Sequence, residues 1–410
     1  MSHAPASPSI ASLLLAAASL LAGCATSISR SPVSAPEQVV WRHGLVIDAS
    51  SSASTLFAYR WRTATGARLP VIESLELPGN DDCEPAPRGL GSYEGRPEEA
   101  AASLTPLFRC ALGVVGGDPA ARERATLLLR GTAGLREISD PAREEILERV
   151  RADLERLPLG EVSARVISGQ DEGIFGWLTV NYLMGHLSHG GPSPTVGALD
   201  LGGASTQITF QPLEIPDRHG RRLRLGDAEY VLYSHSYLGL GQDRARIAVD
   251  SPACYLRNYP LEEGRTGTGD FAACREAIHE RFARPCEASP CSIFGVHQPP
   301  VHGDFLAFSV YYYTARALGI AGRLTPTELA EAGVDFCAAD WLELTAKDPD
   351  LASDPYFPNH CFAAAYVTTL LTEGWGFTPT TERVHALRRL RGTQVGWTLG
   401  ALLVELTDGD

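Results

Sequence analysis

The amino-acid sequence predicts an α/β protein built from two similar domains that face each other across a cleft. The main observation is a repeated pattern: a short apolar strand ends in an aspartate, and a turn of small residues leads into a second strand-like run. The two copies are VIDASSSASTLFAYRW (residues 46–61) and LDLGGASTQITF (residues 199–210). Strand-like and helical segments alternate along the chain, which is typical of layered α/β domains. With 410 residues, 44% of them hydrophobic, the chain is long enough for two such domains.

The first copy predicts a hairpin around Asp48. A strand at 71–77 and a loop rich in glycine and proline follow, and then helices at 97–114 and 119–124. Residues 125–137, ATLLLRGTAGLRE, predict an apolar strand, a Gly-Thr-Ala-Gly turn and a helix.

The next segment, ARVISGQDEGIFGWLTVNYLMG at 164–185, predicts a strand, an acidic turn and an amphipathic helix. The second copy of the repeat then predicts a hairpin around Asp200. The basic stretch RHGRRLRL is interpreted as a solvated hairpin tip. A cysteine-rich irregular region and closing helices complete the chain.

The N-terminal segment indicates export. Residues 10–21 form an apolar run too short to span a bilayer comfortably, and LAGC ends it with small residues before Cys24. This arrangement resembles a bacterial lipoprotein signal, so residues 1–24 are expected to be a signal peptide with Cys24 lipidated. Residues 25–40, rich in serine and proline, then predict a flexible tether. The expected location is extracytoplasmic, anchored by lipid to a bacterial membrane.

Charge excludes several classes of function. The formal net charge of −14 argues against nucleic acid or an anionic membrane surface as a partner. No G-x-x-x-x-G-K-[ST] sequence is present, which excludes a P-loop. An anionic substrate would therefore need a metal cation to help bring it into the site.

The cysteines beyond Cys24 form an even set of eight, which behind an export signal predicts disulfides. The zinc alternative would need pairs of the C-x-x-C type, and these are absent. The eight are Cys83, Cys110, Cys254, Cys274, Cys286, Cys291, Cys337 and Cys361.

The small-residue turns suit a polyphosphate. Close packing of backbone amides and hydroxyls against phosphate requires small residues, and a divalent cation must offset the charge. The turns supply Ser51, Ser52, Thr132, Gly202, Gly203 and Ser205. Asp48 and Asp200, at strand ends on opposite sides of the predicted cleft, suit Mg²⁺ or Ca²⁺ held partly through water. The alternative is that each aspartate only caps its turn.

Hydrolysis also needs a base for water, and the QDEG turn offers Asp171 and Glu172. An acidic side chain at the start of a helix is equally a good helix cap. Both interpretations stay open at this point.

Six blocks resemble a known family when taken together. They are VIDASSSAS, GTAGLRE, SGQDEGIFGWLTVNYLMG, GALDLGGASTQITF, CSIFGVHQPPVHGDFLAFSVYYYTA and QVGWTLGAL. In this order they resemble the ecto-apyrase-type nucleoside triphosphate diphosphohydrolases, a family that also includes Golgi nucleoside diphosphatases. The resemblance implies two actin-like (ribonuclease H-like) domains, one at 41–168 completed by 386–410 and the other at 169–385.

The resemblance also implies roles for particular residues. Glu172 would be the base, Ser205 and Gln207 would position the attacking water, and Asp48 and Asp200 would hold the metal through water. Phosphates would contact Ser51, Ser52, Thr132, Gly202 and Gly203. The nucleobase would stack on Tyr313, and Tyr356 occupies the position of an arginine of the family's base pocket. The implied disulfides are Cys83–Cys110, Cys254–Cys274, Cys286–Cys291 and Cys337–Cys361.

The sequence therefore predicts a monomeric, metal-dependent hydrolase of nucleoside tri- and diphosphates that uses Mg²⁺ or Ca²⁺. One alternative is a polyphosphate or guanosine-polyphosphate phosphatase of the same superfamily. Another is a nucleotide-binding surface lipoprotein without turnover, which the water-positioning set of Glu172, Ser205 and Gln207 disfavours.

Overall fold

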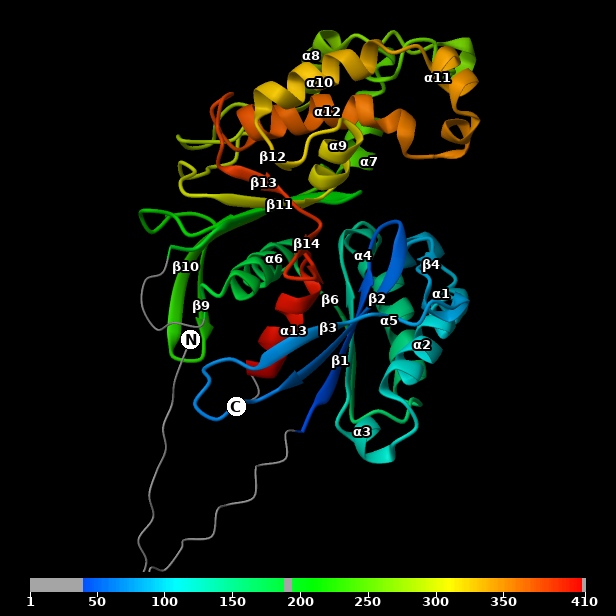
Figure 1. The fold of residues 1–410 in the computed structure, drawn as a ribbon, viewed down its shortest axis with the longest axis vertical. Helices are drawn as coiled ribbons and strands as arrows, with labels where there is room; N and C mark the ends of the chain where they lie inside the picture. Colours follow the sequence, from blue (N-terminus) through cyan, green and yellow to red (C-terminus); the bar gives the residue numbers. More distant parts are fainter. Residues whose placement is uncertain (1–39, 188–193, 408–410) are drawn as a thin grey trace, which may run out of the picture. The chain divides into compact units, whose positions relative to one another are not determined.

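A computed structural model describes residues 40–187 and 194–407 (Figure 1). The predicted signal peptide, Cys24 and nearly all of the predicted tether lie outside the described residues. Two mixed β-sheets carry the described fold, together with a small hairpin. Every helix within these two ranges is too short or too polar to cross a bilayer.

The first sheet has the strand order β3-β2-β1-β5-β6, and the short strand β4 also pairs with β2. Its strands are β1 (Arg42–Ala49), β2 (Ala53–Arg62), β3 (Val71–Leu75), β4 (Ala86–Pro87), β5 (Thr126–Gly131) and β6 (Glu161–Val166). β1 and β2 pair antiparallel and form the hairpin predicted around Asp48. β5 runs parallel to β1, with Asp48 opposite Arg130. Asp48 and the turn after β5 therefore lie at the same edge of the sheet.

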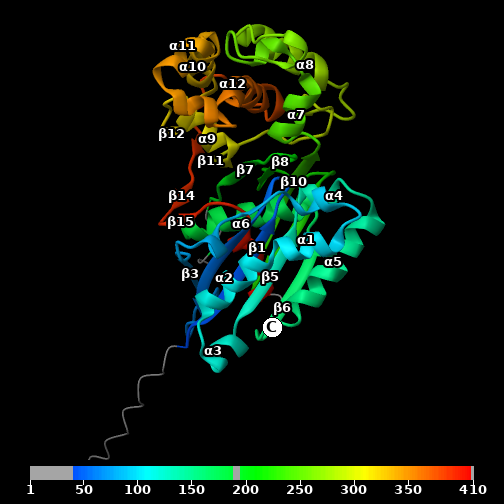
Figure 2. The ribbon, with the colours of Figure 1, turned by 90° about the vertical axis from the view of Figure 1, so that its right-hand side faces the viewer.

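Helices cover one face of this sheet, as Figure 2 shows for α1, α2 and α5. The helices of this part are α1 (Pro97–Ser103), α2 (Thr105–Val115), α3 (Pro119–Glu123), α4 (Ala133–Arg136) and α5 (Asp140–Leu154). The single helix predicted at 97–114 is wrong, because the structure breaks it at Leu104. Pro106 lacks an N–H group and its ring obstructs the preceding helical turn, so a new helix begins at Thr105.

The second sheet has the order β12-β13-β11-β7-β8-β10-β9. Its strands are β7 (Gly197–Leu201), β8 (Ser205–Phe210), β9 (Gly220–Leu225), β10 (Ala228–Leu238), β11 (Phe305–Ser309), β12 (Gly322–Arg323) and β13 (Val384–Ala386). β7 and β8 form the second predicted hairpin, in which Asp200 lies opposite Gln207.

The basic stretch predicted as a hairpin tip is instead most of strand β9, so that prediction is wrong. β9 pairs with β10 from Gly220 opposite Tyr233 to Leu225 opposite Ala228, which leaves Gly226 and Asp227 as the turn. The alternation of arginine and leucine in this stretch is a strand pattern. Its arginine side chains are solvated, as the sequence indicated.

Most of the remaining helices lie between strands of the second sheet along the chain, and in Figure 1 α8, α10 and α12 lie beyond β11 and β13. They are α6 (Gly169–Met184), α7 (Gln242–Val249), α8 (Phe271–Phe282), α9 (Val310–Ala317), α10 (Pro326–Ala338), α11 (Trp341–Lys347), α12 (His360–Thr369) and α13 (Thr398–Thr407). A small hairpin, β14 (Arg389–Leu390) with β15 (Thr393–Gln394), precedes α13.

Helices α6 and α13 connect the two sheets. α6 packs against β7, β8 and β10, and α13 packs against both α6 and β1. One buried cluster accordingly includes Val46 of the first sheet, Phe308 of the second, Trp177 of α6 and Leu402 of α13. A Cβ atom on Gly400 would lie 2.0 Å from the Phe175 carbonyl oxygen, so this glycine permits the close contact of the helices. The domain boundaries named above stay a prediction.

Four disulfides join the eight cysteines of the described chain. The pairs are Cys83–Cys110, Cys254–Cys274, Cys286–Cys291 and Cys337–Cys361, the same pairs that the family resemblance implies.

We expect the Cys286–Cys291 bridge to be reduced first. Cys286 is exposed and Cys291 partly exposed, whereas Cys337 and Cys361 are fully buried, and exchange requires a thiolate to reach a sulfur atom. Mild reductant without denaturant, followed by alkylation and peptide mapping, would show this order. Early alkylation of Cys337 or Cys361 in the folded protein would contradict it.

Candidate active site

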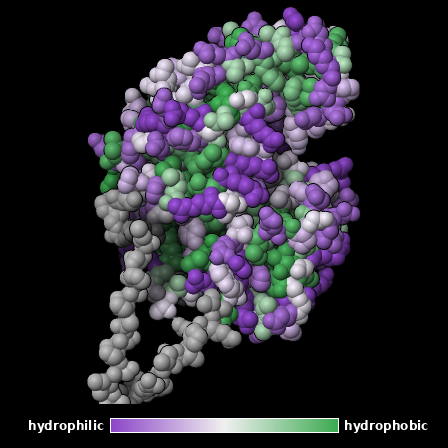
Figure 3. Space-filling model, viewed as in Figure 1, coloured by the Kyte–Doolittle hydropathy of each residue, from purple (hydrophilic) through white to green (hydrophobic). Residues whose placement is uncertain are grey.

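The two aspartate-ended strands β1 and β7 lead into one cavity of about 320 Å³. Its lining includes Asp48, Ser51, Ser52, Thr132, Glu172, Asp200, Gly202, Gly203, Ser205, Tyr313 and Trp397. The two small-residue turns face each other here, since a Cβ atom on Gly203 would lie 3.1 Å from Ser51 Oγ. In Figure 3, which shares the view of Figure 1, the surface is indented between the upper helices and the part around β4 and α1. The lining includes all five residues that are predicted to contact phosphate, so these residues share a single cavity.

The start of α6 separates the two adjacent acids of the QDEG turn. Ser168 caps the helix by accepting a hydrogen bond from the Asp171 N–H at 3.0 Å, and its hydroxyl donates to Asp171 Oδ2 at 2.7 Å. Asp171 is exposed and takes part in the cap. Glu172 is only 8% exposed and lines the cavity. The geometry thus places the first acid beside the Ser168 cap and the second at the site.

Glu172, Ser205 and Gln207 form one hydrogen-bonded set. The Gln207 amide nitrogen lies 3.1 Å from Glu172 Oε2, 2.9 Å from Ser205 Oγ and 3.1 Å from Ser236 Oγ. Glu172 and Gln207 come from α6 and β8, elements that pack directly against each other. Gly173 allows this contact, because a Cβ atom there would lie 2.6 Å from the Thr209 hydroxyl oxygen.

Arg136 joins this set, although sequence reasoning did not identify it. Its guanidinium Nη2 donates to Glu172 Oε2 at 2.8 Å and lies 3.2 Å from Ser205 Oγ. Its Nη1 donates to the Ile167 carbonyl oxygen at 3.1 Å. The one available signal was its position in the GTAGLRE block, four residues after Thr132.

The site brings the carboxyl groups of Asp48, Asp200 and Glu172 together in an environment with little access to solvent. Burial raises the pKa of Asp48 well above its usual range, and the nearby Glu172 and Asp200 raise it further. Burial and Glu172 likewise raise the pKa of Asp200 to about 7. Burial also raises the pKa of Glu172, but the Arg136 guanidinium opposes part of that shift. The Arg136 guanidinium thus lowers the pKa of Asp48 and Glu172 only in part, and Asp200 has no cation among the described groups that shift its pKa.

These residues fit a divalent cation held through water. The Asp48 Oδ1 atom is buried and has no hydrogen-bond partner, while the Trp397 side chain hydrogen-bonds the same carboxyl group. In the part of the chain that the structure describes, no three histidine, cysteine or acidic side chains are arranged to hold a metal directly. Hydrated Mg²⁺ or Ca²⁺ contacts carboxylates through its water shell, and it would supply the missing positive charge.

The two residues predicted for the nucleobase are placed differently. Tyr313, at the start of α9, lines the cavity and is 44% exposed. Tyr356 is 67% exposed and does not line it, and its backbone N–H donates to Asp354 Oδ1 at 2.8 Å. The structure therefore brings only Tyr313 together with the carboxylates.

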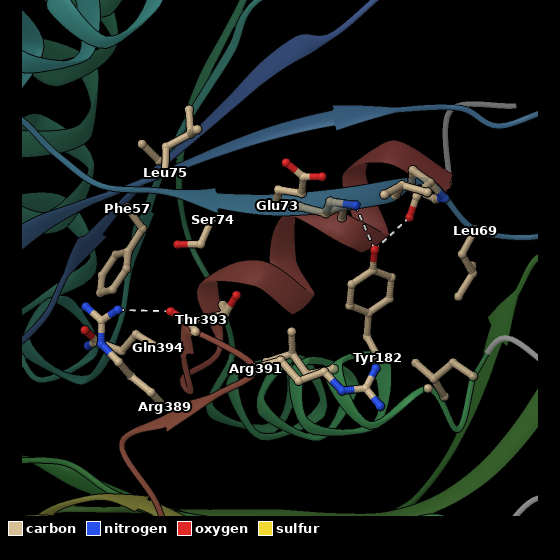
Figure 4. Close-up of a pocket in the computed structure, with 18 of the residues that line it drawn as sticks. Phe57, Leu69, Glu73, Ser74, Leu75, Tyr182, Arg389, Arg391, Thr393 and Gln394 are labelled. Atoms are coloured by element: carbon tan, nitrogen blue, oxygen red, sulfur yellow. Dashed lines mark hydrogen bonds between the residues drawn. The ribbon is translucent and has the colours of Figure 1, made fainter. Parts of the chain in front are cut away.

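A larger cavity of about 1090 Å³ runs along the edge strand β3 (Figure 4). The Tyr182 hydroxyl accepts from the Ile72 N–H at 2.8 Å and donates to the Pro70 carbonyl at 2.9 Å, which satisfies part of the strand edge. Phe57 and Gln394 line both cavities. No residue that the sequence analysis places in the site lines the larger one, so the smaller, carboxylate-rich cavity is the candidate active site.

Solved structures establish the fold class. A nucleoside triphosphate hydrolase from Neospora caninum superposes with a TM-score of 0.64 at 14% identity, covering 90% of this chain and 93% of its own. The Ppx/GppA family member of Aquifex aeolicus superposes with a TM-score of 0.53 at 16% identity, covering 90% and 99%. At these identities the likeness shows the fold alone, and it confirms the predicted actin-like α/β class.

Sequence comparison then gives the family. The model of the GDA1/CD39 (nucleoside phosphatase) family matches residues 35–258 and 255–409, so the chain belongs to this family and is an enzyme of it. Ectonucleoside triphosphate diphosphohydrolase 1 of Mus musculus is 30% identical over 90% of this chain and 81% of its own length. Ectonucleoside triphosphate diphosphohydrolase 8 of Gallus gallus is 32% identical over 88% and 82%.

Proposed function

We propose that this protein is a metal-dependent hydrolase that removes the terminal phosphate of nucleoside tri- and diphosphates. The observation that carries the proposal is the hydrogen-bonded set of Glu172, Gln207 and Ser205 at a cavity lined by two small-residue turns. The family and the printed names of its relatives support the substrate class.

In the proposed mechanism, Ser205 and Gln207 hold a water molecule beside Glu172. Glu172 accepts a proton from this water as the water oxygen attacks the terminal phosphorus atom. The bond from that phosphorus to the bridging oxygen breaks, and inorganic phosphate and the shortened nucleotide are released. A divalent cation bound through water to Asp48 and Asp200 would offset the charge of the phosphate chain.

The rest of the cavity would bind the substrate. Backbone amides and hydroxyls of Ser51, Ser52, Thr132, Gly202 and Gly203 would hold the phosphates, since these residues are small enough for close approach. The nucleobase would stack on Tyr313. Tyr356, which does not line the cavity, stays a predicted second contact of the base.

We also propose an oligomeric state, a domain organisation and a location for this protein. We expect a monomer with two actin-like domains, at 41–168 with 386–410 and at 169–385. We also expect lipid attachment at Cys24 and an extracytoplasmic location. The enzymes named above as relatives are ecto-enzymes, which agrees with a surface location.

Phosphate release from a substrate panel would test the proposed function. The panel contains ATP, ADP, GTP, GDP, UDP and AMP, with inorganic polyphosphate and guanosine tetraphosphate for the alternative suggested by the Ppx/GppA likeness. We expect release from nucleoside di- or triphosphates with Mg²⁺ or Ca²⁺, and none in EDTA. Release from polyphosphate or guanosine tetraphosphate alone would favour the alternative, and nucleotide binding without release would favour a non-catalytic lipoprotein.

Replacing Arg136 should change the pH dependence of the reaction. The base must be ionised, so activity rises with pH through the pKa of Glu172. In Arg136→Gln the opposing positive charge is lost, so we expect the acid limb of the kcat profile to move to higher pH. Arg136→Lys, which keeps the charge, should move it less. A uniform loss of rate with an unmoved acid limb would mean that Arg136 has only a structural role.

A further inference from the structure

Two histidine side chains meet where β9 begins beside β10. The Nδ1 atoms of His219 and His235 are 3.2 Å apart, and their ring centroids are 4.3 Å apart. His219 directly precedes β9 and has a φ of 58°, a left-handed conformation that is uncommon for a residue with a side chain. Its carbonyl accepts from the Ser234 N–H at 3.2 Å, which fixes its position beside β10.

The pair lies on the face of β10 opposite to the active site. Successive side chains of a strand point to opposite faces. The Ser234 and Ser236 hydroxyls lie within hydrogen-bond distance of Thr209 and Gln207, on the side of the catalytic set. His235, between them, turns the other way and contacts the ring of Tyr237 at a centroid distance of 4.3 Å. A ligand on the pair would therefore be separate from the nucleotide cavity.

The separation of the two nitrogens suits a shared metal ion. Zinc–nitrogen bonds of about 2.0–2.1 Å in a tetrahedral site place two ligand nitrogens roughly 3.3–3.4 Å apart. Imidazole nitrogen favours Zn²⁺, Cu²⁺ and Ni²⁺, whereas Mg²⁺ and Ca²⁺ prefer oxygen ligands such as those of the active site. Both rings are partly accessible to solvent, so an ion can reach them.

The surroundings favour the neutral form of both rings, which is the form that binds metals. Burial and His219 lower the pKa of His235 to about 4. Burial, His297 and Arg218 lower the pKa of His219, and Glu287 opposes this. Between neutral rings, the short nitrogen–nitrogen contact requires one Nδ1 proton. When a metal binds, that proton moves to Nε2 of the same ring through solvent, so no net proton is released.

We propose that His219 and His235 form a binding site for a divalent ion of the late first transition series, with Zn²⁺ as the representative. Two imidazoles supply the protein ligands and water completes the coordination, because among the described residues no third histidine, cysteine or acidic side chain joins them. The bound ion would link the start of β9 to β10, two elements that are otherwise joined here through backbone hydrogen bonds.

Calorimetric titration of ZnCl₂ into the full chain, without an affinity tag and with excess Mg²⁺ on the oxygen sites, would test the proposal. We expect one zinc ion to bind per chain, with an affinity that requires both histidines. His219→Gln and His235→Gln should each weaken binding by at least about tenfold, since even loss of a supporting contact typically costs 10–100-fold in metal affinity. His302→Gln is the matched control, because the His302 Nε2–H donates to the Gln211 carbonyl oxygen at 2.7 Å and takes no part in the pair. The zinc affinity of this variant should be unchanged.

A spectroscopic measurement on the unmutated chain keeps the proposal testable if a variant fails to fold. The electron paramagnetic resonance spectrum with one equivalent of Cu²⁺ should show splitting from two imidazole nitrogens. A spectrum with oxygen ligands only would overturn the proposal. Zinc binding that is equally tight in the folded His219→Gln/His235→Gln double variant would also overturn it.

Discussion

Glu172→Gln should lower kcat by about 10²–10⁴-fold, or roughly 3–5 kcal/mol of barrier, and leave the fold and nucleotide binding largely intact. Glutamine has the same shape and can keep a contact with Gln207, but it does not accept a proton from water at neutral pH. It would also leave Arg136 without its ion-pair partner, at a site where the two side chains are 2.8 Å apart. Steady-state kinetics combined with binding of a non-hydrolysable nucleotide would separate loss of turnover from loss of affinity.

Asp171→Asn is the matched control for this prediction. Asp171 is exposed and hydrogen-bonds Ser168 at the helix start, so its replacement should change melting temperature slightly and turnover little. If both acids were only helix caps, both variants would retain near-normal turnover. That outcome, in the single variants and in the double variant, would remove the general base from this turn.

The strand ends of the site could be predicted because the pattern that identifies them lies within a few consecutive residues. An aspartate that closes an apolar run and precedes a turn of small residues can be recognised in a single sequence, and Asp48 and Asp200 indeed line one cavity. The break at Leu104 also had a local signal in Pro106, which the prediction of one helix at 97–114 did not take into account. The alternation of arginine and leucine at the end of β9 is likewise a local signal, and it indicates a strand and not a hairpin tip.

The features that were not predicted depend on contacts between distant residues. Arg136 and Glu172 are 36 positions apart, and only the folding of the chain brings them together. Which acid of the QDEG turn faces the cavity depends on where the helix begins, which the cap at Ser168 decides. The contact of His219 with His235 likewise depends on the register of β9 against β10, which is a property of the folded chain.

Asp48→Asn should reduce turnover by at least about 10²-fold and yet leave the metal-free protein as stable as the unmutated one, or more stable. Asparagine keeps the shape of Asp48 and can still hydrogen-bond the Trp397 side chain. It removes a half-buried carboxyl group beside Asp200 and Glu172, and the Oδ1 atom of this group is buried without a hydrogen-bond partner. A buried charge without a partner opposes folding, so its removal relieves repulsion. The same charge would hold the cation in the working enzyme, and losing one such electrostatic contact typically costs 10²–10³-fold in rate.

Thermal unfolding with and without Mg²⁺ would distinguish this role from that of a turn cap. A cation that binds only the folded state raises the melting temperature of the unmutated protein as its concentration rises. We expect this rise to be lost or strongly reduced in Asp48→Asn and retained in Asp171→Asn, whose acid is exposed and away from the cavity. A turn cap would give the opposite pattern: a lower melting temperature in EDTA, with an unchanged response to Mg²⁺ and unchanged turnover. In EDTA the metal role predicts an unchanged or higher melting temperature and the turn cap a lower one, so the comparison assigns Asp48 to the metal or to the turn.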